Sequence, residues 1–405
     1  MGSFRVRGGI PLFGRVKVSG SKNAALPVIF AAVATRGISE IDNLPDISDV
    51  GAALEILEEL GARITRSGSM TYVDTRALVY REPSAELVRK IRASTYLLSS
   101  MLARFGKVTV GEFGGCSFSP RPIDMHLHAL ASHGAVIEER DIRAERLVPS
   151  DVLFDKRSVG ATVNALILAA ATDGISTVSG CALEPHIMTL IDYLVSAGAS
   201  ISLSGDVATV RGCSLGGGKV HIGGDMIEAG SFLAASVMTG GAVSVYGVDS
   251  SELQAFVAPF VRAGVEYSSD IRVMLRGVPK SAVNVVASPY PGFPTDLQPI
   301  AAPLLSFAGG SITDTVWQHR FGYLSELSRF GIRSRTVGGV AEIFRSEPRA
   351  AEATAPDLRG GMALMLAALC ADGESVIHSG ELLMRGYERL TEKLTALGAE
   401  IEYLG

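Results

Sequence analysis

The stretch Leu60-Gly61-Ala62-Arg63-Ile64 joins the end of an apolar, helix-like pattern to the start of a strand-like one. Variants of it occur six times in the 405-residue chain, with the glycine at Gly61, Gly134, Gly198, Gly264, Gly331 and Gly398. The intervals between these glycines are 73, 64, 66, 67 and 67 residues. Glycine directly after a helix readily takes the left-handed backbone conformation that reverses the chain. The stretch therefore predicts a helix–turn–strand unit that repeats along the whole chain.

A second glycine marker runs in phase with the first, where another apolar helix pattern ends and a strand begins. Its glycines are Gly37, Gly106, Gly174, Gly241, Gly310 and Gly373, at intervals of 69, 68, 67, 69 and 63 residues, and we expect the same left-handed cap. Chance recurrence is the alternative, but two markers with one period favour a true repeat. Each copy is then a βαβαβ-type unit whose two apolar helices need its siblings as cover. Six such units exceed one core, so we divide them into two domains of three.

Composition narrows the class of protein. With 47% apolar and 20% charged residues the chain is predicted to be globular, and its net charge of −5 argues against nucleic-acid binding. The longest apolar stretches, such as residues 165–171, are far shorter than the ~20 residues that span a bilayer, so no membrane association is expected. Four cysteines without zinc-ligand spacing or a disulfide framework, and an N-terminus without a signal-peptide pattern, predict a cytoplasmic protein.

Residues 112–126, EFGGCSFSPRPIDMH, carry the candidate nucleophile of the chain. Two glycines place Cys116 in a flexible turn, and Arg121 follows five residues later. A partly exposed thiol beside a cation is reactive, because positive charge favours the thiolate. A small apolar residue packed under a loop is an equally good interpretation of this segment alone, since free cysteines are usually buried.

Polar and basic residues gather at the predicted starts of the buried helices, in residues 19–27, 156–162, 293–298 and 356–361. Backbone N–H groups at a helix start, with a lysine or arginine nearby, suit a phosphate group, although a plain helix cap explains any single segment better. Together, the recurring basic residues predict a cleft for a multiply anionic substrate: Lys22, Arg92, Arg121, Lys156, Arg320, Arg359 and Arg385. No P-loop or dinucleotide fingerprint is present, so the sequence does not support nucleoside triphosphate or NAD chemistry.

With these residues in view, the chain resembles the enolpyruvyl transferases along its whole length. The motifs that carry the resemblance are GSKNAALP, RAS, GGC followed by RPIDMH, DKRSVGAT, EP, IEAGSF, FPTD, DLR and RGYE. The resemblance implies a two-domain α/β (α+β) fold, an inside-out α/β barrel of six βαβαββ repeats with three repeats per domain. It implies an N-terminal domain of residues 22–224 with the Cys116 loop, and a C-terminal domain of residues 1–21 plus 225–405. Two strands cross between the domains, and the active site lies in the interdomain cleft.

The resemblance also implies a reaction. The motifs are most similar to those of members that transfer the enolpyruvyl group of phosphoenolpyruvate to the 3′-hydroxyl of UDP-N-acetylglucosamine and release phosphate. This is the first committed step of peptidoglycan precursor synthesis. The implied partners are small-molecule substrates, and neither a metal nor an organic cofactor is implied.

Roles follow from the matching motifs. Cys116 is implied to protonate the methylene carbon of phosphoenolpyruvate, and Asp296 to take the proton of the sugar hydroxyl. Lys22 and Arg385 complete the catalytic set. The implied substrate-binding residues are Lys22, Asn23, Arg121 and Arg385 for phosphoenolpyruvate; Arg121, Pro122, Ile123, Asp124 and Met125 for uridine; Lys156, Arg157, Ser158 and Val159 for the diphosphate; Val316 for the sugar; and Arg92, Arg320 and Arg359 for charge stabilisation or closure. Asp357 is also implied to bind substrate.

Three positions depart from the family pattern. Met226 follows Asp225 where arginine is usual, Tyr96 stands where tryptophan is common, and His319 replaces an asparagine. These positions bear on the acceptor rather than on enolpyruvyl transfer. The alternative acceptor is therefore another uridine nucleotide, for example UMP, in a specialised pathway. A nucleotide-binding relative without turnover is a third hypothesis, which the presence of the catalytic set disfavours.

Overall fold

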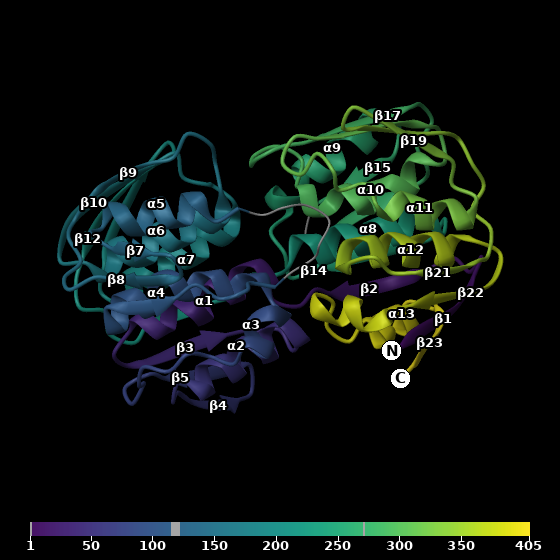
Figure 1. The fold of residues 1–405 in the computed structure, drawn as a ribbon. Helices are drawn as coiled ribbons and strands as arrows, with labels where there is room; N and C mark the ends of the chain where they lie inside the picture. Colours follow the sequence, from purple (N-terminus) through teal and green to yellow (C-terminus); the bar gives the residue numbers. More distant parts are fainter. Residues whose placement is uncertain (1, 115–121, 270–271) are drawn as a thin grey trace. The chain divides into compact units, whose positions relative to one another are not determined.

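The computed structural model describes residues 2–114, 122–269 and 272–405 (Figure 1). The chain divides into two compact units, which we call the N-terminal unit, Gly20–Gly223, and the C-terminal unit, Met1–Ser19 with Gly224–Gly405. The chain therefore passes from one unit to the other twice, after Ser19 and after Gly223.

Three sheets of described strands build the N-terminal unit, with the orders β13-β3-β5-β4, β6-β8-β7 and β11-β12-β10-β9. The strands are β3 (Ile38–Asp42), β4 (Arg63–Ser67), β5 (Met70–Asp74), β6 (Lys107–Thr109), β7 (Val136–Glu138), β8 (Asp141–Arg143), β9 (Asp151–Leu153), β10 (Gly174–Ser179), β11 (Ser200–Ser204), β12 (Val207–Gly212) and β13 (Lys219–His221). The helices are α1 (Lys22–Ala31), η1 (Ala32–Ala34), α2 (Ser48–Glu59), α3 (Ala85–Lys90), η2 (Arg92–Tyr96), α4 (Leu97–Phe105), α5 (Asp124–Ser132), α6 (Val159–Ala171) and α7 (Pro185–Ser196).

The C-terminal unit also has three sheets of described strands, with the orders β15-β16-β14-β2, β17-β18-β20-β19 and β21-β22-β1-β23. The strands are β1 (Ser3–Gly8), β2 (Phe13–Lys17), β14 (Ala242–Tyr246), β15 (Glu266–Ser268), β16 (Val273–Arg276), β17 (Val283–Ala287), β18 (Gly310–Asp314), β19 (Ser334–Val337), β20 (Val340–Ile343), β21 (Glu352–Thr354), β22 (Gly373–His378) and β23 (Glu400–Leu404). The helices are α8 (Met226–Met238), η3 (Ser250–Leu253), α9 (Gln254–Arg262), η4 (Thr295–Leu297), α10 (Gln298–Leu305), α11 (Tyr323–Leu327), η5 (Ser328–Phe330), α12 (Leu358–Cys370), η6 (Gly380–Arg385) and α13 (Leu390–Ala396).

Five of the six sheets of described strands contain one parallel strand pair beside antiparallel strands, and β6-β8-β7 contains antiparallel pairs alone, which confirms the repeated α/β architecture. A strand, a buried helix and a second strand parallel to the first recur as β9-α6-β10, β17-α10-β18 and β21-α12-β22. An antiparallel hairpin then completes the sheet, as β11-β12 and β19-β20 do. The period of the sequence is thus the period of the sheets.

Two strands are exchanged between equivalent repeats. β2 precedes α1 in the chain but pairs in parallel with β14, which follows α8. β13 precedes α8 but pairs in parallel with β3, which follows α1. Each strand therefore belongs to one unit and leads directly into the first buried helix of the other. Both passages of the chain between the units are strand-to-helix connections.

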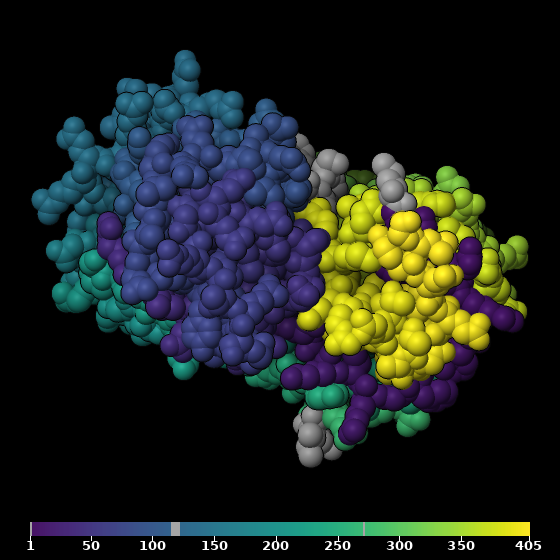
Figure 2. Space-filling model, turned by 90° about the horizontal axis from the view of Figure 1, so that it is seen from below, coloured from purple at the N-terminus to yellow at the C-terminus, as the bar shows by residue number. Residues whose placement is uncertain are grey.

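The N-terminal strand closes the sixth repeat. β1 pairs antiparallel with both β22 and β23, so that residues from the two ends of the chain share one sheet. On the face shown in Figure 2, the purple N-terminal residues lie beside the yellow C-terminal residues. The sixth sheet is therefore complete only when the first residues of the chain join it.

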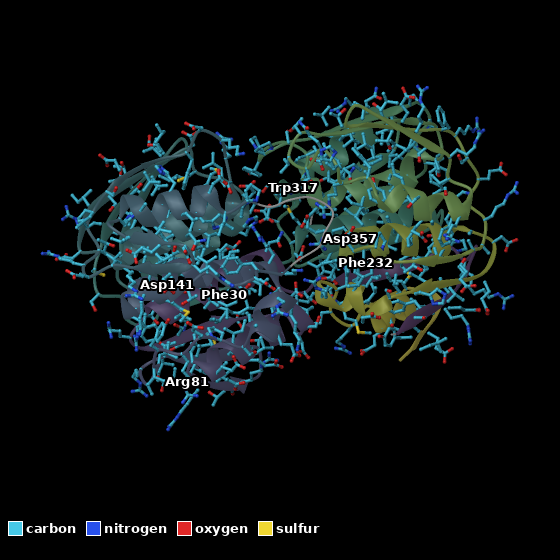
Figure 3. The ribbon with its side chains drawn as sticks, viewed as in Figure 1. Phe30, Arg81, Asp141, Phe232, Trp317 and Asp357 are labelled. Atoms are coloured by element: carbon cyan, nitrogen blue, oxygen red, sulfur yellow. The ribbon has the colours of Figure 1, made fainter. Side chains whose placement is uncertain are left out.

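The core of each unit is made of helices that are buried on every side. α8 and α12 are almost wholly buried, and so is α6 from Ala161 to Ala170. Helices that are apolar all round belong in a core. In the C-terminal unit α8, α10 and α12 pack against one another, and in the N-terminal unit α4 packs against α1 and α6. Figure 3 labels Phe30 and Phe232, both fully buried within these helices, and the exposed Arg81 and Asp141. None of the described helices combines the length and apolarity needed to cross a membrane.

The glycine markers are confirmed in part. The six glycines of the first marker all have positive φ, between 81° and 121°. In the second marker the expectation of a left-handed cap is wrong at Gly37 and Gly241, which do not have positive φ. Close backbone contacts explain why glycine is needed at these two positions. A Cβ on Gly37 would lie 2.3 Å from Gly217 N, and one on Gly241 would lie 1.9 Å from Leu12 O.

Candidate active site

The buried helices of the C-terminal unit begin just beyond the carboxyl ends of its strands. α10 follows β17 through η4, and α12 follows β21. Asp225 caps α8, and Asp357 caps α12 by accepting hydrogen bonds from the backbone N–H groups of Arg359 and Gly360 at 2.8 and 3.0 Å. For Asp357 the helix-cap interpretation therefore holds. Ligands of open α/β sheets bind at such strand ends.

Asp296 lies between two buried arginines of this unit. Its Oδ1 accepts a hydrogen bond from Arg320 Nη1 at 2.8 Å, and its Oδ2 accepts one from Arg359 Nη2 at 3.3 Å. The Arg320 and Arg359 side chains are 5% and 3% exposed, whereas that of Asp296 is 29% exposed. Burial lowers the pKa of Arg359, but the nearby Asp296, Tyr387 and Asp225 outweigh burial and raise that pKa above its usual value. The two arginines therefore hold the Asp296 carboxylate in one orientation.

Val316 lies on the segment that follows β18. Asp314 ends that strand and is 1% exposed, and its Oδ1 accepts hydrogen bonds from the backbone N–H groups of Val316 and Trp317 at 2.9 and 2.8 Å. Its Oδ2 accepts a hydrogen bond from Thr295 Oγ1 at 2.6 Å. The structure thus connects Val316, through one buried carboxylate, to the residue next to Asp296.

Arg385 ends η6 in the same unit and is half-buried. Two residues further on, the ring of Tyr387 lies 5.6 Å from Arg359 Cζ, and its hydroxyl lies 2.8 Å from Ser231 Oγ on α8. The RGYE segment is therefore next to the DLR segment. The C-terminal unit brings together Asp296, Arg320 and Arg359, with Arg385 on an adjoining element.

In the N-terminal unit, the first buried helix begins with Lys22 and Asn23. Lys22 Nζ lies 2.6 Å from Asp49 Oδ2 on α2, and the two side chains are 13% and 5% exposed. Ser21 precedes the helix but makes no capping hydrogen bond with its side chain. The polar residues here are thus more than a helix cap, because they include a largely buried ion pair.

Arg92 and the RPIDMH segment meet in the same unit. Arg92 opens η2, Asp124 opens α5, and the charges of both act on His126. Burial and then the Arg92 charge lower the pKa of His126 to about 4, so the imidazole is neutral at neutral pH. Asn164 Nδ2 lies 2.7 Å from His126 Nδ1 and donates to it. Burial also lowers the pKa of Arg92.

The remaining predicted nucleotide-binding residues lie at two adjoining helix starts. Pro122, Ile123, Asp124 and Met125 lead into α5, whereas Lys156, Arg157, Ser158 and Val159 lead into α6. Lys156 is exposed, Arg157 Nη2 lies 3.5 Å from Asp206 Oδ2, and Ser158 caps α6 by accepting from Ala161 N at 3.3 Å. A Cβ on Gly160 would lie 2.7 Å from His126 Cε1, which shows how closely the two helix starts approach.

Two of the predicted residues, Cys116 and Arg121, lie outside the described residues. The others divide between the units, with Lys22 and Arg92 in the N-terminal one and Asp296 and Arg385 in the C-terminal one. Their convergence on one substrate stays a prediction.

Sequence reasoning missed the residues that hold the site residues in place. These are Asp49, His126, Asn164, Thr295 and Asp314. Thr295 lies in the FPTD motif and His126 in the RPIDMH motif, so their positions in the sequence could have marked both. No local signal marks Asp49, because its partner Lys22 lies on another helix.

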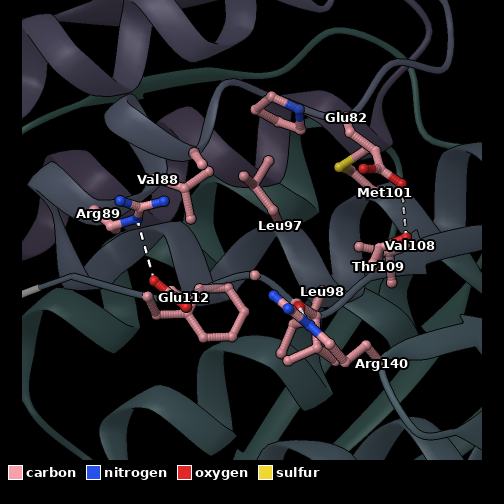
Figure 4. A pocket seen from close by; sticks show the side chains of 15 residues that line it. Glu82, Val88, Arg89, Leu97, Leu98, Met101, Val108, Thr109, Glu112 and Arg140 are labelled. Atoms are coloured by element: carbon pink, nitrogen blue, oxygen red, sulfur yellow. Dashed lines mark hydrogen bonds and ion pairs between the residues drawn. The ribbon is translucent and has the colours of Figure 1, made fainter.

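A cavity of about 300 Å³ lies in the N-terminal unit (Figure 4). Its lining includes Val88, Leu98 and Met101, and beside it Arg89 Nε lies 3.3 Å from Glu112 Oε2. The described residues that line it include none of the predicted site residues. Within residues 2–114, 122–269 and 272–405, no cluster of three His, Cys, Asp or Glu side chains is arranged to hold a metal ion.

Comparison with solved structures supports the fold. The crystal structure of the enolpyruvyl transferase NikO from Streptomyces tendae matches with a TM-score of 0.87 at 26% identity, over 100% of this chain and 99% of that chain. An EPSP synthase from Acinetobacter baumannii matches with a TM-score of 0.73 at 17% identity, over 100% of both chains, and supports the fold alone.

Comparison with known sequences agrees with the motifs. UDP-N-acetylglucosamine 1-carboxyvinyltransferase 3 of Caldanaerobacter subterraneus is 39% identical over 99% of both chains. UDP-N-acetylglucosamine 1-carboxyvinyltransferase of Halothermothrix orenii is 38% identical, also over 99% of both. The family model described as EPSP synthase (3-phosphoshikimate 1-carboxyvinyltransferase) matches residues 6–394. The chain therefore belongs to the EPSP synthase family of enolpyruvyl transferases.

Proposed function

We propose that this chain transfers the enolpyruvyl group of phosphoenolpyruvate to the 3′-hydroxyl of UDP-N-acetylglucosamine and releases phosphate. The observation that carries the proposal is the 39% identity, over 99% of both chains, to a relative named for this transfer. The reaction begins peptidoglycan precursor synthesis and so serves cell-wall biogenesis. A cytoplasmic setting is part of the proposal, supported by the free thiols of Cys181, Cys213 and Cys370.

The first step of the proposed reaction is an addition. Asp296 accepts the proton of the 3′-hydroxyl while the hydroxyl oxygen bonds to C2 of phosphoenolpyruvate. The Cys116 thiol gives a proton to C3, so that the double bond becomes single and a tetrahedral adduct forms. A positioned acid or base typically contributes ~10²–10⁴-fold to such proton transfers. The contacts of Asp296 with Arg320 and Arg359 support its part by keeping the carboxylate oriented.

The second step is an elimination. The bond between C2 and the phosphate oxygen breaks, C3 gives a proton to the Cys116 thiolate left by the first step, and the double bond forms again. The proton first taken by Asp296 passes to the departing phosphate. The products are the enolpyruvyl ether of the sugar nucleotide and inorganic phosphate, so atoms and charge balance without an oxidant or a reductant.

Charge explains the number of basic residues. Phosphoenolpyruvate carries about three negative charges, which need several converging cations for binding and orientation. Lys22, Arg121 and Arg385 fill this role in the proposal. Because Lys22 and Arg385 belong to different units, both units would contribute residues to the binding of phosphoenolpyruvate.

The sugar nucleotide is proposed to lie along the helix starts of the N-terminal unit. Residues 121–125 would hold the uridine, and Lys156 to Val159 would hold the diphosphate. The start of α6, with its backbone N–H groups and the exposed Lys156, supports the second assignment. Val316, which Asp314 holds at the end of β18, would contact the sugar.

An acceptor screen tests this function. Purified protein with phosphoenolpyruvate is given UDP-N-acetylglucosamine, UMP or no acceptor, and released phosphate is measured. We expect release with UDP-N-acetylglucosamine alone. Release with UMP and not with the sugar nucleotide would replace the proposed acceptor by another uridine nucleotide, and no release with any acceptor would favour a binding protein without turnover.

Variants of Cys116 test the proposed acid. Cys116→Ala should abolish turnover, because no proton donor for carbon remains. Cys116→Asp should keep activity, since a carboxylic acid can also protonate carbon, and should lose sensitivity to the thiol-alkylating epoxide fosfomycin. Full turnover by Cys116→Ala, or retained fosfomycin sensitivity in Cys116→Asp, would contradict this role.

A further inference from the structure

The carboxylate of Asp314 is buried in the C-terminal unit and bound by neutral donors. The residue is 1% exposed, and its oxygens accept hydrogen bonds from Thr295 Oγ1 and from the backbone N–H groups of Val316 and Trp317. Within the described residues no lysine, arginine or histidine lies within ion-pair distance of it. Burying a charge without a paired cation costs stability, so we attribute the value of this carboxylate to the geometry that it imposes.

One oxygen of Asp314 holds Thr295, and Thr295 is tied to the proposed base from its other side. Arg320 Nη1 donates to the Thr295 carbonyl oxygen at 3.1 Å and to Asp296 Oδ1 at 2.8 Å. The Thr295 hydroxyl donates a hydrogen bond to Asp314 Oδ2 at 2.6 Å and accepts one from Arg320 Nη1 at 3.4 Å. The backbone on which Asp296 is carried is therefore fixed at the residue immediately before it.

The other oxygen of Asp314 holds the segment with the proposed sugar contact. Oδ1 accepts from Val316 N at 2.9 Å and from Trp317 N at 2.8 Å, which shapes the turn that follows β18. The same segment continues to Arg320, whose guanidinium returns to Asp296. Hydrogen bonds therefore join the segment of Thr295 and Asp296 to the segment from Asp314 to Arg320 at both ends of the latter.

We propose that Asp314 is a positioning residue for enolpyruvyl transfer, which acts through Thr295 to set Asp296 in register with the acceptor held at Val316. The inference rests on the proposed function, in which Asp296 is the base. It follows from geometry, because one carboxylate binds both the segment of the base and the segment of the acceptor contact. A displacement of about 1 Å at a reacting group can cost roughly 10²-fold in rate, so loss of this link should appear in kcat.

Matched variants of Thr295 isolate the link. Thr295→Val keeps the shape of the side chain but removes the hydroxyl that binds Asp314, whereas Thr295→Ser keeps the hydroxyl and removes only a methyl group. We expect kcat to fall about 10- to 100-fold in Thr295→Val and less than about threefold in Thr295→Ser. The KM for phosphoenolpyruvate should stay within about threefold in both, because its proposed ligands are untouched.

A pH profile separates positioning from a merely structural role. In Thr295→Val, and in Asp314→Ala, the segment that carries Asp296 loses its tie to Asp314, so we expect the Arg320–Asp296 contact to weaken and the acid limb of the kcat profile to move to higher pH. In Thr295→Ser the limb should stay in place. Thermal unfolding of each variant gives the folded fraction, and rates are expressed per folded molecule.

The outcomes are distinct. Wild-type kcat and an unmoved acid limb in Thr295→Val overturn the inference while leaving the proposed function intact, and so does a Thr295→Ser variant as slow as Thr295→Val. If Thr295→Val does not fold, the other two variants still test the inference. Loss of activity in Thr295→Ser, or an unmoved acid limb in Asp314→Ala, would then overturn it. Wild-type protein without turnover on any acceptor overturns the proposed function, and the inference with it.

Discussion

Lys22 Nζ lies 2.6 Å from Asp49 Oδ2, and both side chains are largely buried in the N-terminal unit. The lysine is the first residue of a buried helix and the carboxylate belongs to the next helix. The proposed phosphoenolpyruvate ligand is thus paired with a carboxylate of a neighbouring helix.

Removing the Asp49 carboxylate should show whether the phosphate of phosphoenolpyruvate can take its place beside Lys22. Asp49→Asn should lower the free energy of unfolding by about 3 kcal/mol, because removing one partner of a buried ion pair is strongly destabilising. Phosphoenolpyruvate should then raise the Tm of the variant more than that of wild type, since its phosphate replaces the lost charge. Urea unfolding and thermal unfolding with and without phosphoenolpyruvate measure both effects.

Asp46→Asn is the matched control for that experiment. Asp46 is exposed, and its Oδ1 lies 3.5 Å from Arg66 Nη1. Loss of such a surface pair should change stability by less than about 1 kcal/mol. Equal Tm gains on phosphoenolpyruvate in wild type and Asp49→Asn would show that Lys22 does not meet the substrate anion.

Asp296→Asn should separate catalysis from binding. The amide keeps the shape of the side chain but cannot take a proton, so kcat should fall by ~10²–10⁴-fold. Stability should also fall, by about 3 kcal/mol, because Arg320 and Arg359 are buried and lose their shared counter-charge. Phosphate release and urea unfolding measure the two losses.

The control for Asp296 is an exposed carboxylate of the same unit. Arg335 Nη2 lies 2.7 Å from Glu342 Oε2 on the surface, so Glu342→Gln should change neither rate nor stability appreciably. A kcat of Asp296→Asn within tenfold of wild type would rule out Asp296 as the base.

His126 should make the stability of the protein depend on pH. Its pKa is lowered from 6.5 to about 4 by burial and by the Arg92 charge, so the unfolded state binds a proton more readily than the folded one. The stabilisation is present above pH 6.5 and is lost as the pH falls towards 4. The difference of 2.5 units between these pKa values corresponds to about 3 kcal/mol.

Unfolding free energies at pH 7, 6, 5 and 4 check this for wild type, His126→Gln and His128→Gln. Wild type and the His128 variant should lose about 3 kcal/mol more than His126→Gln over this range, because His128 is exposed. Parallel curves for wild type and His126→Gln would refute the assignment.

The thiols should differ in reactivity. Burial raises the pKa of Cys181 and of Cys370 to about 11, which leaves about one part in a thousand as thiolate at pH 8. We expect iodoacetamide at pH 8 to label Cys116 first, as followed by mass spectrometry, with Cys116→Asp as the control. Labelling of Cys181 or Cys370 as fast as Cys116 would contradict the proposed reactive loop.

The repeat could be predicted because each copy is marked by a short contiguous stretch of sequence. Glycines such as Gly61 and Gly398 must adopt positive φ where a helix turns into a strand, and this requirement shows in the sequence at every copy. The reason for glycine at Gly37 and Gly241 could not be predicted in this way. Their need for glycine comes from backbone segments far away in the chain, Gly217 and Leu12, which no local pattern reveals.

The candidate site likewise has features that the sequence determines and features that only the tertiary structure decides. The sequence by itself determined the family, the period of the fold and the chemical types of the site residues, because motifs such as FPTD and DLR are contiguous. Only the tertiary structure decided that Asp296 sits between Arg320 and Arg359, that Lys22 pairs with Asp49, and that β2 and β13 exchange sheets. Those relationships join residues tens to hundreds of positions apart, and they exist only once buried helices and completed sheets have brought the segments together.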